Sequence, residues 1–114
     1  MKMVVVLKEN QTVIDEVELA NSFIRRFFGL MYRKTMAKNH GLLLSPCNQI
    51  HTFGMNFEID ALFLSADYVI IKIEESMKPR KVFKPVKDAR YVLELCGGTA
   101  KDVGLKVGDK LEIR

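Results

Sequence analysis

A thiol, an imidazole and a carboxylate lie close together in the stretch CNQIHTFGMNFEID, which runs from Cys47 to Asp60. With Cys96 from elsewhere in the chain, these groups have the types that nucleophilic catalysis uses: a cysteine nucleophile, His51 as its base and Asp60 to orient the imidazole. Cysteine and histidine are also frequent zinc ligands. The stretch is therefore a catalytic site, a metal site, or a wall of the fold with inward polar side chains.

Local spacing argues against a metal at Cys47 and His51. Zinc ligand atoms lie about 2.0 to 2.3 Å from the ion, and positions i and i+4 meet only in a helix. In a strand the same four residues span roughly 13 Å. Pro46 and the β-branched Ile50 and Thr52 disfavour a helix. We therefore expect extended backbone, no metal site and no cofactor.

The polar groups of this stretch still allow an enzyme or a binding module. A hydrolase- or transferase-like enzyme would bring Cys47 or Cys96 to His51, but a lone cysteine is usually a small buried hydrophobe. Asp60 begins an apolar strand and must be paired or solvated there, with a backbone amide, an arginine or His51 as partner. We leave the enzyme open and favour a structural pairing for Asp60.

A non-catalytic ligand-binding or accessory module is the leading interpretation. Polar groups concentrated among apolar strands are typical of ligand pockets. The candidate pocket residues are His51, Thr52, Asp60, Arg26 and Arg33. The expected partner is a small polar or anionic ligand.

Two further segments have possible binding roles. The segment 78–87 carries five basic residues around Phe83 and two prolines, which allows weak binding to a nucleic-acid backbone. Prolines and lysines also protect exposed loops and edges, so nucleic acid is the less favoured partner. Gly97, Gly98 and Thr99 open a predicted helix whose free amides suit an anion, although most such turns only cap a helix.

The elements that must position these side chains are mainly strands. Short segments rich in β-branched and apolar residues, bounded by polar turns, predict strands. These segments are 3–7, 12–19, 42–44, 59–64, 69–73, 91–95 and 110–113. Because so many short strands expose edges in a small chain, we expect a closed or partly open barrel-like sheet.

Two helices complete the predicted α+β, mostly β fold. The first begins at Asn21 or Ser22, ends near Gly29, and has a wide apolar face that includes Phe27 and Met31 and must be buried on the sheet. Arg25 and Arg26 would then point to water. The second is a short C-terminal helix in which Thr99 and Asp102 form a capping box.

Length and composition favour one soluble domain over residues 1–114. Apolar residues make up 48% and charged residues 28% of the chain, and the net charge is only +4. No apolar run is long enough to span a bilayer, and we find no export signal, so a cytoplasmic location with reduced cysteines is expected. The sequence does not indicate an oligomeric state.

Four segments together resemble domain of unknown function family number 192. They are SFIRRFFGLMYR, CNQIHTFGMNFEIDALFL, ESMKP, and the closing YVLEL with GTAKDVGLKVGDKLEI. The resemblance implies a small, mostly β domain. It implies no activity, substrate or cofactor.

Overall fold

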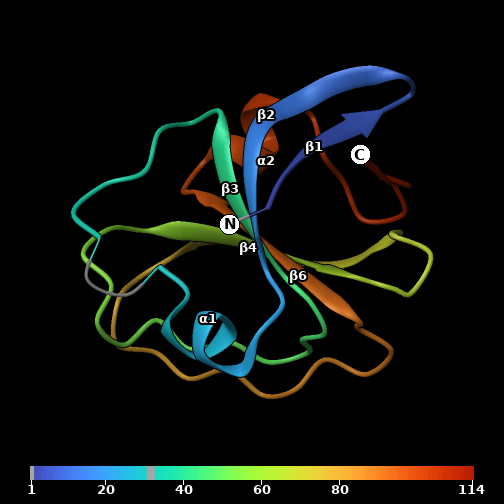
Figure 1. Ribbon diagram of the computed structural model, residues 1–114. Helices are drawn as coiled ribbons and strands as arrows, with labels where there is room; N and C mark the ends of the chain where they lie inside the picture. Colours follow the sequence, from blue (N-terminus) through green and yellow to red (C-terminus); the bar gives the residue numbers. More distant parts are fainter. Residues whose placement is uncertain (1, 31–32) are drawn as a thin grey trace.

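One strongly curled sheet forms the frame of the molecule (Figure 1). The computed structural model describes residues 2–30 and 33–114, with the backbone alone for residues 23, 24 and 28. The strands of the described chain are β1 (Met3–Lys8), β2 (Gln11–Ala20), β3 (His40–Leu44), β4 (Ile59–Leu64), β5 (Ile70–Met77), β6 (Tyr91–Cys96) and β7 (Glu112–Ile113). Their order is β5-β4-β6-β3-β2-β1-β7. The β2 and β3 pair is parallel and the other pairs are antiparallel.

The two outer ends of the sheet approach each other, so the sheet is a half-barrel. Val69, just before β5, forms an antiparallel bridge with Lys110, just before β7. The amide of Ile70 donates to the carbonyl of Asp109 at 2.8 Å. The prediction of a mostly β, α+β fold with a barrel-like sheet of seven short strands is confirmed at this level.

Both faces of the central strands are buried. Successive residues of a strand point to opposite faces, so along β6 Leu93 and Leu95 join one apolar cluster with β1, β2 and α2 (Thr99–Asp102). Val92 joins a second cluster, which includes Ile50 and Met55 from the irregular chain between β3 and β4. This second face is the one that carries the candidate site.

Helix α1 (Phe23–Phe28) lies at the lower end of the view in Figure 1 and is shorter than its apolar pattern suggests. Ser22 is its N-cap and accepts a hydrogen bond from the Arg25 amide, and Gly29 ends it with a φ of 49°. The expectation that Phe27 is buried on the sheet is wrong, because Phe27 is 53% exposed. Six residues make under two turns, which leaves no room for a wide buried face. The expectation for Met31 falls outside the described residues.

The expectation of extended backbone through the opening stretch is wrong at residues 53 and 54, where the chain turns. Residues 47–58 are irregular; His51 makes an isolated bridge with Val82, and a turn follows in which the Met55 amide donates to the Thr52 carbonyl at 3.3 Å. Gly54 in this turn has a φ of 76°, which glycine adopts without strain. Contacts with a distant loop hold the stretch, so its strand-like composition does not decide its backbone.

The capping box predicted for the second helix is also wrong. The N-cap of α2 is Gly98, and no side chain of α2 caps the helix. The Thr99 side chain is buried, and its Oγ1 has no hydrogen-bond partner among the described residues. The cap comes instead from Asp60 on β4.

Candidate functional site

Asp60 is fully buried and holds three backbone amides. Oδ1 accepts hydrogen bonds from the amides of Ser76 at 2.8 Å and Gly98 at 3.1 Å, and Oδ2 accepts from Ala100 at 2.9 Å. The helix start that could bind an external anion is therefore occupied by a carboxylate of the same chain. Asp60 lines none of the cavities described below, and its contacts are those of a structural tie between β4, β5 and α2.

Thr52 has a similar structural role, because it connects the opening stretch to the basic loop of residues 78–87. Its buried hydroxyl donates to the carbonyl of Lys78 at 2.7 Å and accepts from the amide of Lys81 at 2.8 Å. The Thr52 amide also donates to the Lys81 carbonyl at 2.7 Å, and the Phe83 amide donates to the Ile50 carbonyl at 3.2 Å. These bonds fix the loop after β5 against the stretch that contains His51.

The structure does not bring the thiols, His51 and Asp60 together. The Cys47 thiol donates to the carbonyl of Gln49 at 3.1 Å, and Cys96 lies at the end of β6 with its register partner Ile59. Burial raises the pKa of the Cys47 thiol, an effect that the Gln49 hydrogen bond and Arg26 only partly offset. A raised pKa leaves less thiolate at neutral pH, which is the opposite of an activated nucleophile.

The two candidate arginines occupy different places. Arg26 is half-buried, not directed to water as expected, and its Nη1 lies 3.4 Å from the carbonyl of Ser45 and 3.5 Å from that of Asn21. Arg33 pairs with Glu18 on β2 at 2.5 Å. Arg26 lines the cavity beside His51, and Arg33 does not.

A small cavity of about 30 Å³ lies between α1, the stretch after β3, and the sheet. His51 enters it from the irregular stretch, where Nε2 lies 3.2 Å from the carbonyl oxygen of Phe27. A carbonyl only accepts, so Nε2 carries the hydrogen and Nδ1 of the neutral ring is an acceptor. Nδ1 is buried and has no partner among the described residues. The cavity residues are Arg26, Phe27, Gly29, Leu44, Gln49, Ile50, His51, Met55 and Glu94.

Glu94 on β6 is the residue of this cavity that sequence reasoning missed. Its side chain is 1% exposed, and Oε1 has no hydrogen-bond partner among the described residues. Burial raises the pKa of Glu94 to about 8, although the Arg33 charge opposes the rise. The carboxyl is therefore mainly protonated at neutral pH. A charged residue between Leu93 and Leu95 in an otherwise apolar strand was the available signal.

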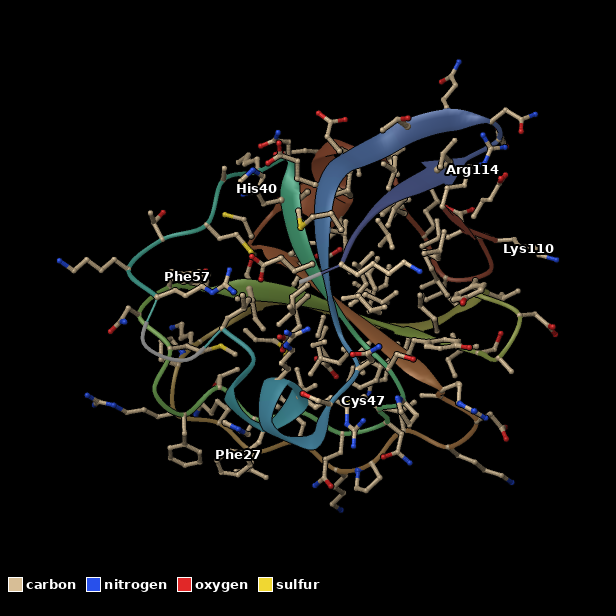
Figure 2. The ribbon with its side chains drawn as sticks, in the orientation of Figure 1. Phe27, His40, Cys47, Phe57, Lys110 and Arg114 are labelled. Carbon is tan, nitrogen blue, oxygen red and sulfur yellow. The ribbon has the colours of Figure 1, made fainter. Side chains whose placement is uncertain are left out.

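A wider apolar cleft of about 460 Å³ adjoins the small cavity and shares four residues with it: Phe27, Gln49, Ile50 and His51. Phe53 and Val82 complete its lining. Phe27, Phe53 and Val82 are among the few large apolar side chains exposed in the described chain. Figure 2 shows Phe27 at the lower end of the molecule. A volume of this size with few polar groups is typical of a small-molecule site.

Two other clefts of the described chain, of about 430 and 410 Å³, have none of the unsatisfied buried side-chain atoms in their linings. His40 lies at the other end of the view in Figure 2, where it pairs with Glu16. No three His, Cys, Asp or Glu side chains among the described residues are placed to hold a metal ion. Among the described residues, no helix is long and apolar enough to cross a bilayer; α1 has six residues and α2 has four.

Three proteins of similar sequence or fold have names that specify no ligand. A UPF0127 protein of Pyrococcus abyssi is 34% identical over 96% of this chain and 97% of its own length. A crystal structure of a protein of unknown function from Novosphingobium aromaticivorans covers 96% of this chain and 83% of its own, with a TM-score of 0.84 at 24% identity. A crystal structure from Sinorhizobium meliloti, of a protein described as a candidate transcription regulator, covers 96% of this chain and 91% of its own chain. Its TM-score is 0.79 and its sequence identity is 34%.

The family model described as Uncharacterized ACR, domain of unknown function family number 192, matches residues 4–113. The match spans nearly the whole chain and agrees with the resemblance seen in the sequence. The protein therefore belongs to this uncharacterised family.

Proposed function

We propose that the domain is a non-catalytic binding module, and that its site is the apolar cleft together with the small polar cavity beside it. One observation supports this most directly. Glu94 Oε1 and His51 Nδ1 are both buried without a hydrogen-bond partner among the described residues, and both residues line the same cavity. A buried polar atom without a partner is costly, so a bound group that satisfies both atoms is stabilised. The apolar cleft supplies the contact area for the rest of that ligand.

The volumes of the small cavity and the apolar cleft indicate a ligand with two parts. The cavity of about 30 Å³ admits a head group about the size of one or two water molecules. The cleft of about 460 Å³ admits a ring or a short alkyl chain against Phe27, Phe53 and Val82. Apolar contact in the cleft would give most of the affinity, and the polar head would fix the orientation.

The proposal differs from the five-residue pocket expected from the sequence. His51 and Arg26 line the cavity, whereas Thr52 and Asp60 make structural hydrogen bonds and Arg33 pairs with Glu18. Catalysis by Cys47 with His51 has no support from the geometry, because the thiol and the imidazole each bond a backbone carbonyl.

Binding of nucleic acid through residues 78–87 is a second candidate. The side chains of Lys78, Lys81 and Lys84 are exposed on this loop, and the Sinorhizobium relative carries a description that concerns transcription. Such binding would weaken steeply with salt and on removal of the Lys81 and Lys84 charges. No retention on double- or single-stranded DNA at low salt would eliminate this candidate.

A matched pair of valines tests the cleft. Val82 is 64% exposed and lines the cleft, whereas Val107 is 60% exposed and lies outside it. Ligands are first identified from a library of small aromatic and aliphatic compounds by the rise in melting temperature. Val82→Asp should then weaken binding about tenfold or more, because it places a charge in an apolar lining. Val107→Asp should leave binding unchanged.

Nuclear magnetic resonance locates the bound compound independently of affinity. Amide shifts confined to residues 26–29, 49–53 and 82 would support the site. A ligand that binds equally well to both valine variants, or a library with no ligand at all, would contradict it.

A further inference from the structure

The inner end of the proposed site offers hydrogen-bond acceptors. Nδ1 of His51 accepts because Nε2 donates to the Phe27 carbonyl. Oε1 of Glu94 is the second unsatisfied atom, and a Cβ added at Gly29 would lie 3.4 Å from it, so the helix end closes over this oxygen. A protonated Glu94 can donate as well as accept, whereas its carboxylate only accepts. With Glu94 ionised, a group that satisfies both atoms must bring at least two hydrogen-bond donors.

The positive charge nearest the cavity does not supply those donors. The guanidinium of Arg26 lies against the carbonyls of Asn21 and Ser45. Its charge acts on Cys47, whereas the charge that acts on Glu94 is that of Arg33, which is paired with Glu18. Glu94 therefore has no dedicated cation among the described residues.

Aromatic rings surround the entrance to this acceptor pair. The ring of His51 lies 6.0 Å from that of Phe27 and 6.4 Å from that of Phe53, measured between centroids. The faces of such rings attract a cation, and the attraction increases when water is excluded. An apolar cleft with aromatic sides and a buried carboxyl at its inner end is complementary to an organic cation.

We infer that the site takes a primary ammonium group on an apolar or aromatic tail, with the ammonium hydrogens donated to Glu94 Oε1 and His51 Nδ1 and the tail in the cleft. This inference rests on the proposed function and names its ligand class. An ammonium nitrogen is about the size of a water molecule, which fits the small cavity. The inference replaces the anionic alternative expected from the sequence.

Binding of an ammonium group is coupled to release of a proton. Glu94 is mainly protonated when the cavity holds no cation, and the bound ammonium favours the carboxylate. The proton leaves the carboxyl for solvent, and the charge pair that remains is neutral overall. Affinity should therefore rise with pH up to about 8, while the amine itself stays charged, as a lysine side chain does.

Three probes that share a phenylethyl tail test the head group: 2-phenylethylammonium, 2-phenylethanol and 3-phenylpropionate. Titration calorimetry at pH 7 in two buffers of different ionisation enthalpy gives affinity and proton release together. The ammonium should bind about tenfold more tightly than the alcohol and release roughly one proton. The carboxylate should bind least well.

Glu94→Gln is the decisive variant, because it keeps the shape of the side chain and removes its titration. Its ammonium affinity should fall about tenfold and lose both the proton release and the pH dependence, while its alcohol affinity stays the same. Glu75→Gln, at an exposed position of β5, is the matched control. Unchanged ammonium binding by a folded Glu94→Gln variant would overturn the inference.

The remaining outcomes separate this inference from the proposed function. Binding of the alcohol or the carboxylate to the cleft, without preference for the ammonium, overturns the ligand class and leaves the cleft as a binding site. Failure of all three probes to bind overturns the ligand class as well. The proposed function then depends on the library and the valine pair alone.

Discussion

The amide of Ala100 donates a hydrogen bond of 2.9 Å to Oδ2 of Asp60, which precedes it by 40 residues. The same carboxylate accepts from the amides of Ser76 and Gly98. Two patterns in the sequence, a helix start with free amides and a carboxylate in an apolar strand, are therefore the two halves of one contact.

Replacement of Asp60 by alanine should destabilise the protein by about 3 kcal/mol or more, because buried amides lose charge-assisted hydrogen bonds. Urea unfolding measures this change. Asp67→Ala, in the exposed turn between β4 and β5, is the control and should cost little. An Asp60→Ala variant as stable as the parent would show that water satisfies these amides equally well.

Glu94 makes stability depend on pH in a direction opposite to that of ordinary carboxylates. Burial raises its folded-state pKa from 4.5 to about 8. The folded state thus holds this proton between those values while the unfolded state loses it, so stability falls as pH rises through that range, by about 5 kcal/mol. Stability from this group is fully present below pH 4.5.

Glu94→Gln cannot ionise and should lack this fall. Melting temperatures measured from pH 4.5 to 9 should show the variant similar to the parent near pH 5 and more stable near pH 8.5. Parallel curves for parent and variant would mean that Glu94 titrates as an exposed carboxyl does.

Gly29→Ala should destabilise the protein by about 1 to 2 kcal/mol, because its φ of 49° strains any other residue. The new methyl would also lie 3.4 Å from Glu94 Oε1. Gly104→Ala, with a φ of 74° and no atom within 4 Å of the new Cβ, measures the backbone cost alone. If Gly29→Ala costs no more than Gly104→Ala, the methyl does not crowd Glu94.

Cys47 should react slowly with iodoacetamide at neutral pH, because burial raises the pKa of its thiol. The rate is measured by mass spectrometry on folded protein and on protein unfolded in urea. We expect the folded rate to be the lower of the two. A folded rate above the unfolded one would restore Cys47 as a candidate nucleophile.

The strands could be predicted because their local composition agrees with their tertiary place. The apolar run IDALFL predicts a strand at 59–64, which is β4, and all six of its residues are buried. The irregular stretch could not be predicted in the same way. Ile50 and Thr52 favour a strand locally, but the Thr52 hydroxyl bonds Lys78 and Lys81, and no local pattern reveals such distant partners.

The candidate site was predictable only in part. The type of His51 and its polar neighbours indicate a site residue, whereas Glu94 lies inside segment 91–95, whose composition predicts only an ordinary strand. The apolar pattern around Phe27 predicts a buried helix face, but α1 has only six residues and Phe27 is 53% exposed.

The pairing of β7 with β1 also affects how the chain must fold during synthesis. Val6 pairs with Ile113, and the amides of Val5 and Arg114 each donate to the carbonyl of the other residue. Because β1 precedes β7 in the chain, the outer edge of β1 leaves the ribosome first and lacks its β7 partner until residues 112–114 follow. Throughout that interval the nascent chain exposes an unpaired strand edge, which is where neighbouring nascent chains would associate.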